Sequence, residues 1–210
     1  MITDDDIKKI IKESISPEKK TKKLDESYVA AEKVFKLNTE FLSEANKQNH
    51  IELYDGYVTD FNEISARLDS ANRLDANSNN SEYRSLKVNE SYNMNAIYLH
   101  ELYFANISDL NSRITMDSLS YMRLARDFGT FDDWQKDFIA CCMSSRCGLA
   151  MTYYNFYTKS FMNTFIDLHS ENVPVFGYPV IVMDVWQHAY YRDYLKDVKT
   201  YVVAMMKQFN

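Results

Sequence analysis

The histidines are the residues of this chain whose spacing could support metal chemistry. His188 follows Asp184 by four residues, where an apolar run changes to a helical pattern, so both side chains can converge on one point. His50 and His100 each fall in a separate long helical pattern, and His169 is the fourth histidine. Three imidazoles and one carboxylate form a nitrogen and oxygen ligand set. Such a set suits iron, manganese or zinc better than a metal that prefers thiolates.

His50 and His100 lie in two long helical patterns. One covers residues 38–67, which contain a single glycine and no proline, and the other covers residues 93–107. Residues 69–91 between them are rich in Ser, Asn and Asp, which favours a loop or a frayed tip. We therefore expect two antiparallel helices that form an αα-hairpin.

The second half of the chain combines helices with a small sheet. Helices are predicted over residues 117–126 and 132–147, and Thr130 is a suitable cap for the second of them. A last helical pattern runs from about residue 187 to residue 209. Runs of β-branched and aromatic residues predict three short antiparallel strands, over residues 151–157, 161–168 and 178–183.

This order of elements predicts an α+β fold, with a long helical hairpin followed by a domain of helices and a small three-stranded antiparallel sheet. The expected boundaries are residues 38–112 for the hairpin and residues 113–210 for the α+β domain. Residues 1–37 form an N-terminal arm, which is either a solvated segment or a docking helix. The apolar stripe of such a helix would consist of Ile7, Ile10, Ile11 and Ile15.

Composition excludes several classes of protein. The 210 residues carry 24 Lys and Arg against 30 Asp and Glu, a net charge of -6, so we expect no nucleic-acid partner. No apolar run approaches the roughly 20 residues of a membrane-spanning helix, and the acidic start does not resemble a signal peptide. Three crowded cysteines predict buried apolar thiols in a reducing, cytoplasmic setting. They are Cys141, Cys142 and Cys147.

One segment around the last histidine resembles the signature of the iron/manganese superoxide dismutases. It reads Asp184-Val-Trp-Gln-His-Ala-Tyr-Tyr-Arg-Asp-Tyr194, and the family signature is Asp-Val-Trp-Glu-His-Ala-Tyr-Tyr. Further matches cover about residues 40–209 and leave the N-terminal arm outside. They are Leu42-Ser43-Glu44 ahead of His50, Tyr57-Val58, His100-Glu-Leu-Tyr-Phe104 and Phe128-Gly-Thr-Phe131.

The resemblance implies a fold, a metal and a reaction. The fold would be that of the dismutases, and each chain would hold one iron or manganese ion that disproportionates superoxide to O2 and hydrogen peroxide. Tyr57 would be the gate residue that relays protons, and Trp186 would form part of an apolar wall. The implied metal ligands are His50, His100, Asp184 and His188.

The chain departs from the family pattern around these ligands. Gln187 replaces a glutamate that reaches across the dimer, and Leu53 and Tyr54 occupy the region where the family has a second histidine after the first ligand. The glutamine beside the metal is absent, and His169 is either an exposed loop residue or its replacement. Val198 aligns with the gate arginine, so the nearest candidate cations are Arg192, Lys196 and Lys199.

The resemblance also implies partners. We expect a homodimer that pairs through Gln187, Tyr190 and Tyr191, with superoxide as the substrate. A structural role on the same fold, for example as a virus-particle component that assembles through the N-terminal arm, is the alternative to the enzyme. The sequence leaves open the choice between iron and manganese, because that choice rests on the residue that replaces the missing glutamine.

Overall fold

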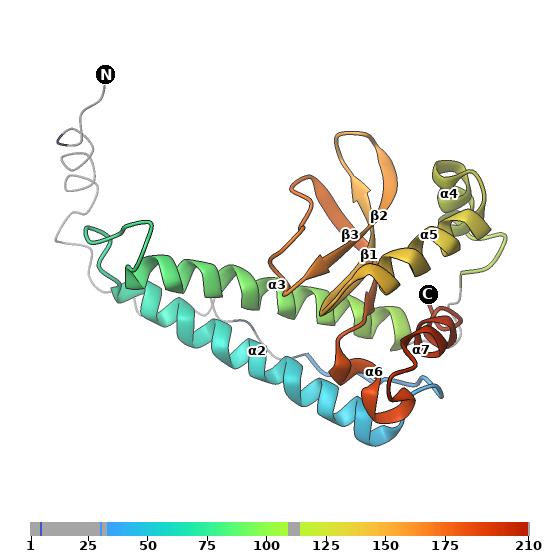
Figure 1. The fold of residues 1–210 in the computed structure, drawn as a ribbon, viewed down its shortest axis with the longest axis horizontal. Coiled ribbons are helices and arrows are strands. Elements are labelled where there is room, and N and C mark those ends of the chain that lie inside the picture. Colours follow the sequence, from blue (N-terminus) through green and yellow to red (C-terminus); the bar gives the residue numbers. More distant parts are fainter. Residues whose placement is uncertain (1–4, 6–29, 31–32, 109–113, 210) are drawn as a thin grey trace.

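A computed structural model describes residues 5, 30, 33–108 and 114–209 (Figure 1). The predicted stripe of isoleucines in the N-terminal arm lies outside the described residues. Within the described part of the chain, no helix combines the length and the apolar character needed to cross a membrane.

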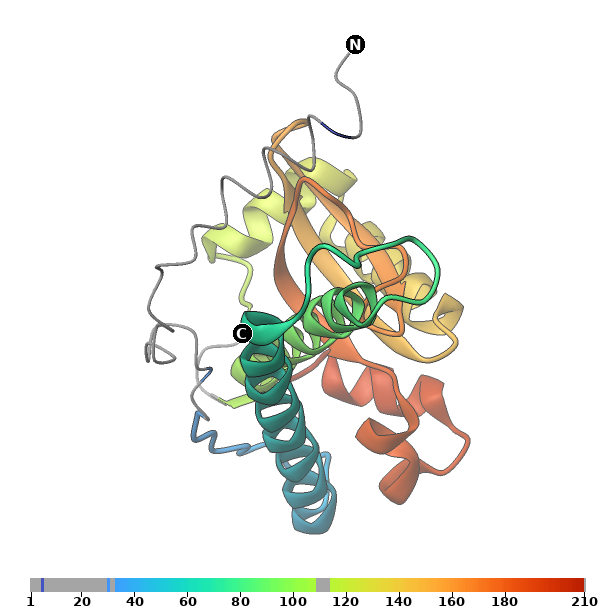
Figure 2. The same ribbon diagram turned by 90° about the vertical axis from the view of Figure 1, so that its left-hand side faces the viewer.

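The predicted helical hairpin is present, and its tip is shorter than expected. α2 spans Glu44–Ser70 and α3 spans Glu82–Ser108, and the two helices run side by side (Figures 1 and 2). Ser43 caps α2 by accepting a hydrogen bond from the Asn46 N–H.

The prediction of a loop over residues 69–91 is wrong for its second half, because residues 82–91 belong to α3. The Ser81 hydroxyl accepts a hydrogen bond from the Arg84 N–H at 3.2 Å and so marks the start of this helix. Leu86 then packs in a small cluster with Leu68 and Ala71 at the end of α2. This tertiary contact stabilises a stretch whose polar composition favoured a loop.

Two shorter helices follow the hairpin and cover one side of the sheet. α4 spans Leu119–Phe128 and α5 spans Phe131–Ser144. The Thr130 hydroxyl accepts a hydrogen bond from the Asp133 N–H, which confirms the predicted cap of α5. Gly129, at φ 92°, makes the turn between the two helices, a conformation that favours glycine.

The sheet has the three antiparallel strands that the sequence predicted. β1 spans Gly148–Asn155, β2 spans Ser160–Asp167 and β3 spans Gly177–Asp184, in the spatial order β2-β1-β3. α3 packs against β3, whereas α4 and α5 pack against β2 and β1. The Asn106 side chain on α3 makes two hydrogen bonds with β3. Its amide nitrogen donates to the Val180 carbonyl, and its oxygen accepts from the Val182 N–H.

The prediction of one helix over residues 187–209 is wrong. α6 spans Gln187–Tyr194 and α7 spans Val198–Met205. Leu195 leaves the helical conformation with φ 52°, and the Asp197 carboxylate then accepts from the Thr200 N–H to begin α7. The break turns the chain so that α7 packs on α5 as well as on α6.

Residues ahead of α2 belong to the core of the hairpin. The Phe35 ring contacts the rings of Tyr54 and Phe104, with centroids 5.7 and 5.1 Å apart. Leu37 and Leu42 are buried as well. The stretch from Phe35 to Leu42 therefore packs on the helices.

The three cysteines differ in their surroundings. Cys142 is buried, and Cys141 is half-buried on the same helix. The prediction of a buried thiol is wrong for Cys147, which is exposed in the short connection between the end of α5 and the start of β1.

Candidate metal centre

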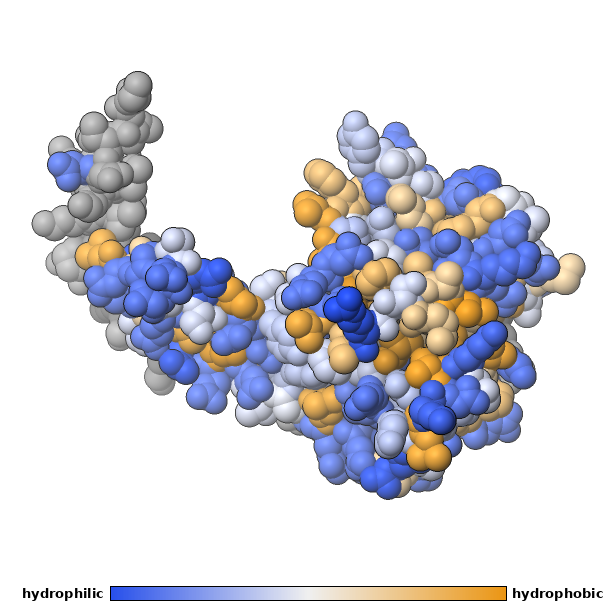
Figure 3. All heavy atoms as spheres, in the orientation of Figure 1, coloured by the Kyte–Doolittle hydropathy of each residue, from blue (hydrophilic) through white to orange (hydrophobic). Residues whose placement is uncertain are grey.

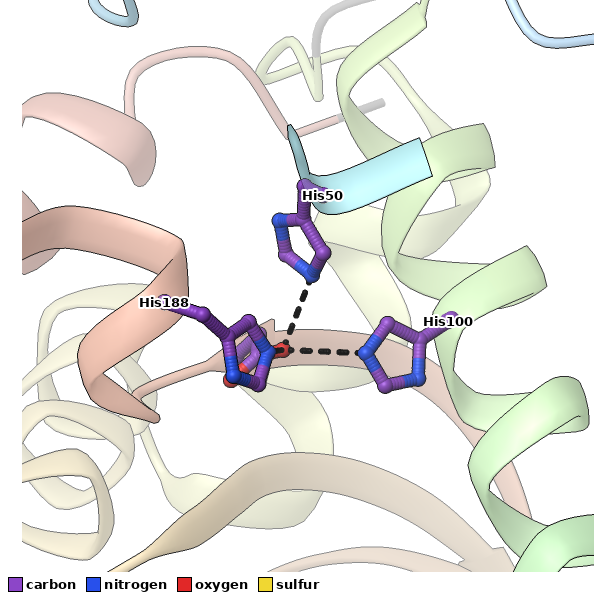
Figure 4. Close-up of side chains that lie close together, drawn as sticks. His50, His100 and His188 are labelled. Atoms are coloured by element: carbon purple, nitrogen blue, oxygen red, sulfur yellow. Dashed lines mark hydrogen bonds and ion pairs between the residues drawn. The ribbon is translucent and has the colours of Figure 1, made fainter. Parts of the chain in front are cut away.

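The four predicted ligands come from four different elements and meet at one point (Figure 4). His50 lies on α2 and His100 on α3, Asp184 is the last residue of β3, and His188 lies in the first turn of α6. One ligand atom from each of these residues lies within 4.8 Å of all the others. The site therefore forms only when the hairpin and the α+β domain are packed together.

One carboxylate oxygen is the centre of this arrangement. Asp184 Oδ2 lies 3.1 Å from His50 Nε2, 3.0 Å from His188 Nε2 and 3.4 Å from His100 Nε2. Asp184 Oδ1 accepts a hydrogen bond from the Trp186 N–H at 2.8 Å. The carboxylate is thus oriented by the turn that connects β3 to α6, as expected of a group placed to bind a cation.

Contacts outside the cluster orient the imidazoles. His100 Nδ1 lies 2.7 Å from the Ala96 carbonyl oxygen, which can only accept, so this nitrogen carries the proton and Nε2 presents a lone pair to the cluster. The Asn46 amide donates to the Ala189 carbonyl at 3.2 Å and joins α2 to α6. This bond holds His50 and His188 on facing helices.

Burial sets the protonation of the site. It lowers the pKa of His50, and it lowers the pKa of His100 to about 3, so both imidazoles are neutral near pH 7. Burial alone would raise the pKa of Asp184, but the imidazoles of His188 and His50 hold it well below its usual value. Neutral imidazoles around an ionised carboxylate are the form in which these groups bind a metal.

The donor set fits an iron or manganese ion. His100 Nε2 is fully buried and has no hydrogen-bond partner among the described residues, a costly arrangement that a bound ion would relieve. Nitrogen and oxygen ligands without thiolate suit iron and manganese, and they also accept zinc.

Tyr57 and His169 lie beside the cluster. The Tyr57 ring centroid is 5.3 Å from that of His100 and 5.5 Å from that of His169. His169 is fully buried, so the interpretation of an exposed loop residue is wrong. Both of its ring nitrogens lack hydrogen-bond partners among the described residues, and its ring stacks on Trp186 at 5.5 Å. The structure thus places an unpaired polar group next to the ligands.

The loop that carries His169 is held by its backbone. His169 adopts φ 55°, and the Asn95 amide donates to its carbonyl oxygen at 2.7 Å. Tyr92, which sequence analysis missed, contacts both His169 and Tyr57, at 5.1 and 6.3 Å between centroids. Its position two helical turns ahead of His100, on the same face of α3, was a signal that could have identified it.

Gln187 lines an open groove next to the cluster. The groove has a volume of about 440 Å³ and borders His188, the one ligand of the four that is not fully enclosed. The Asn49 amide, oriented with its oxygen toward Arg192, accepts a hydrogen bond from that guanidinium at 2.9 Å. The groove is lined by Asn46, Asn49, Gln187, His188, Tyr191 and Arg192.

The residue in the place of the family's second histidine faces away from the cluster. The Tyr54 hydroxyl donates to Glu101 Oε1 at 3.0 Å, and Lys33 pairs with the same carboxylate. Burial raises the pKa of Tyr54 to about 12, so this hydroxyl stays protonated. Tyr54 therefore joins the segment ahead of α2 to the hairpin and does not contact the ligands.

Comparison with known proteins agrees with this geometry. Residues 118–210 match the family described as iron/manganese superoxide dismutases, C-terminal domain. The chain is 33% identical over 177 residues to the superoxide dismutase [Fe] of Aquifex pyrophilus, with 82% of each chain covered. The chain belongs to the iron/manganese superoxide dismutase family.

Other members of the family include both iron and manganese proteins. The superoxide dismutase [Fe] of Aquifex aeolicus is 32% identical over 177 residues, again with 82% of each chain covered. The superoxide dismutase [Mn] 1 of Halobacterium salinarum is 29% identical over 117 residues, which cover 56% of this chain and 58% of that protein. The α+β fold predicted from the sequence is confirmed by this membership.

Proposed function

We propose that this chain is a superoxide dismutase that uses one iron or manganese ion, held by His50, His100, Asp184 and His188. The convergence of four ligand atoms within 4.8 Å in a member of this family is the observation that carries the proposal. The relatives named above are all dismutases, which favours the enzyme over a structural component of a virus particle.

The metal, when bound, supplies one-electron redox chemistry by cycling between its divalent and trivalent states. The carboxylate of Asp184 would contribute the negative charge that stabilises the trivalent state, and the imidazole ligands would add none. The Ala96 carbonyl fixes the His100 ring, and the Trp186 N–H fixes the carboxylate. These contacts would hold the imidazole and the carboxylate in fixed positions around a bound ion.

Proton supply is the second task of the site, because peroxide forms only when two protons reach the reduced oxygen species. Burial and the neighbouring Tyr92 raise the pKa of the Tyr57 hydroxyl, which therefore stays protonated and can donate a hydrogen bond. Burial lowers the pKa of His169 to about 4, so its imidazole is neutral, with one nitrogen donating and the other accepting. We assign Tyr57 and His169 to proton delivery and to hydrogen bonding beside the metal.

A positive charge at the groove would attract the substrate. Superoxide is an anion and the chain carries a net charge of -6, so a local positive group is needed to attract it. Arg192 lines the groove beside His188, whereas Lys196 and Lys199 do not. We therefore assign this role to Arg192 among the candidate cations.

The proposed function is tested by metal analysis together with an assay of superoxide consumption. The purified protein should contain about one iron or manganese ion per chain and should consume superoxide. We expect a rate about two orders of magnitude below the diffusion limit, because several family groups around the metal are replaced. A protein that binds only zinc, or that is no faster than free metal in buffer, would contradict the proposal.

Tyr57→Phe should lower kcat about 10-fold and leave the metal content unchanged, because Tyr57 lies beside His100 and His169 without being a ligand. Stopped-flow measurement of superoxide decay, with metal analysis of the same samples, checks this prediction. Tyr121→Phe, on α4, is the matched control and should behave like the parent protein. Equal rates for Tyr57→Phe and the parent would remove Tyr57 from proton delivery.

A homodimer through α6 is the expected assembly. Gln187 and Tyr191 are exposed on this helix, next to the groove at His188, and Gln187 would reach His188 of the second copy. Tyr190 is largely buried within its own chain and supports the surface from beneath. Light scattering at micromolar concentration should show at least a dimer, and a monomer would contradict the prediction.

Two further proposals concern the cellular setting of the protein and its N-terminal arm. A reducing, cytoplasmic setting is consistent with the three cysteines, which are unpaired in the structure. A larger assembly through residues 1–37 stays a proposal.

A further inference from the structure

Tyr92 on α3 belongs to a layer of three rings beside the metal centre. Its ring centroid is 5.1 Å from that of His169 and 6.3 Å from that of Tyr57. The centroids of Tyr57 and His169 are 5.5 Å apart. The interplanar angles of the three pairs are 72°, 63° and 82°, so each ring meets the other two edge to face. Tyr92 is thus in contact with both side chains to which proton delivery is assigned.

Packing alone does not account for the hydroxyl of Tyr92. A phenylalanine would fill the same space and make the same edge-to-face contacts without adding a polar group to the layer. The ring nitrogens of His169 already lack hydrogen-bond partners within the described part of the chain. The layer therefore holds more polar groups than its packing requires, which is typical of a functional site.

The hydroxyl groups of Tyr57 and Tyr92 influence each other. Burial makes the largest contribution to the raised pKa of the Tyr57 hydroxyl, and the neighbouring Tyr92 makes the next. Tyr57 therefore keeps its proton near pH 7. A hydroxyl that stays protonated can still pass a proton along a chain of groups, because its oxygen accepts one proton while it releases another.

Water has access to the chain on both sides of this layer. Tyr92 is half-buried, whereas His169 is fully buried. An open groove of about 550 Å³ is lined by Ser91 and Ser170, which are the chain neighbours of Tyr92 and His169. On the face seen in Figure 3, hydrophilic side chains gather over the end of the hairpin that carries this groove. Tyr92 is therefore placed to exchange protons with solvent.

We propose that Tyr92 is a positioning residue that supplies protons to Tyr57 from solvent at the groove beside Ser91 and Ser170. The inference rests on the proposed function, in which Tyr57 delivers protons, and it adds the step that restores the proton of Tyr57. When Tyr57 gives up its hydroxyl proton, the Tyr92 hydroxyl transfers its own proton to the Tyr57 oxygen and receives one from water. Only O–H bonds form and break, and both phenols end in the state in which they began.

Tyr92→Phe keeps the ring and removes only the hydroxyl, so the metal content should equal that of the parent. Stopped-flow measurement should show kcat lowered about 5-fold, less than in Tyr57→Phe, because the hydroxyl acts through another group. The value of kcat/KM should stay within about 2-fold of the parent, since the first encounter with superoxide needs no proton. The double variant should be no slower than Tyr57→Phe alone, because Tyr92 acts through Tyr57.

A second measurement needs neither metal nor turnover. Carbon NMR of the full metal-free chain, labelled at the Cζ atom of tyrosine, reports the surroundings of each phenol oxygen. The resonance that is missing in Tyr57→Phe belongs to Tyr57, and it should shift in Tyr92→Phe because its hydroxyl loses a neighbour. Tyr98→Phe is the matched control, since it removes a hydroxyl from the same helix, where Tyr98 packs on Tyr178. It should leave both this resonance and the rate unchanged.

Three results would overturn the inference while the proposed function stands. The first is an active parent whose kcat is unchanged in Tyr92→Phe. The second is a double variant that loses the full factor of each single variant, since the two hydroxyls would then act independently. The third is a Tyr57 resonance that does not move in Tyr92→Phe. A metal-loaded parent that does not consume superoxide would instead refute the proposed function, and the role of Tyr92 with it.

Discussion

Asp184→Ala is expected to yield a folded protein that holds almost no iron or manganese. Its Oδ2 atom lies within 3.4 Å of three imidazole nitrogens, so the substitution removes the one anionic ligand and the centre of the cluster. The three imidazoles that remain include no anionic ligand and so do not balance the charge of a trivalent ion. Metal analysis should fall from about one ion per chain to near zero, and superoxide consumption to the level of free metal.

The matched control for this experiment is Asp60→Ala, which removes an exposed carboxylate from α2 without touching the cluster. It should retain both metal and activity. Circular dichroism of both variants should show the helical content of the parent. A folded Asp184→Ala protein that keeps a full complement of iron or manganese would contradict the assignment of this residue as a ligand.

His169→Ala is expected to lower kcat about 10- to 100-fold while the metal stays bound, a range typical of groups that orient ligands or bound water at metal sites. His169 is fully buried beside His100, with both nitrogens unpaired among the described residues, so its polarity has no structural use there. The optical spectrum of the metal should shift as well, because a hydrogen-bonding group beside the metal is lost.

His169→Gln provides the control for His169→Ala, since an amide keeps a donor and an acceptor at this position. We expect it to recover much of the lost rate. If alanine and glutamine variants both match the parent in rate and in spectrum, His169 fills space beside Trp186 and has no role in the reaction.

Local signals in the sequence were sufficient for most of the fold. Thr130 and the strand runs after Gly148 determine structure through capping and β-propensity, which act within a few residues. The start of α3 could not be predicted because it depends on Leu86 packing against Leu68, a contact between residues far apart in the sequence. α6 ends at Leu195, which adopts a positive φ. Leucine rarely does so, and the sequence pattern therefore did not predict the break between α6 and α7.

The candidate site could be predicted from the sequence only in part. The spacing of Asp184 and His188 is local, and it predicted that these two ligands converge on one point. The environment of His169 was not predictable, because its burial results from Trp186 on one side and Tyr92 on the other. Tyr57 follows His50 by seven residues, about two turns of the unbroken helix α2, so both side chains lie on the same face of that helix.

The distribution of the ligands along the chain constrains when the metal can enter. His50 and Asp184 are separated by 134 residues, yet they contact each other in the folded protein. A growing polypeptide therefore possesses no competent site until β3 and α6 have been synthesised and have docked on the hairpin. Metal insertion is therefore expected late in biogenesis, and a bound ion, held by ligands from both halves, would couple the unfolding of the hairpin to that of the α+β domain.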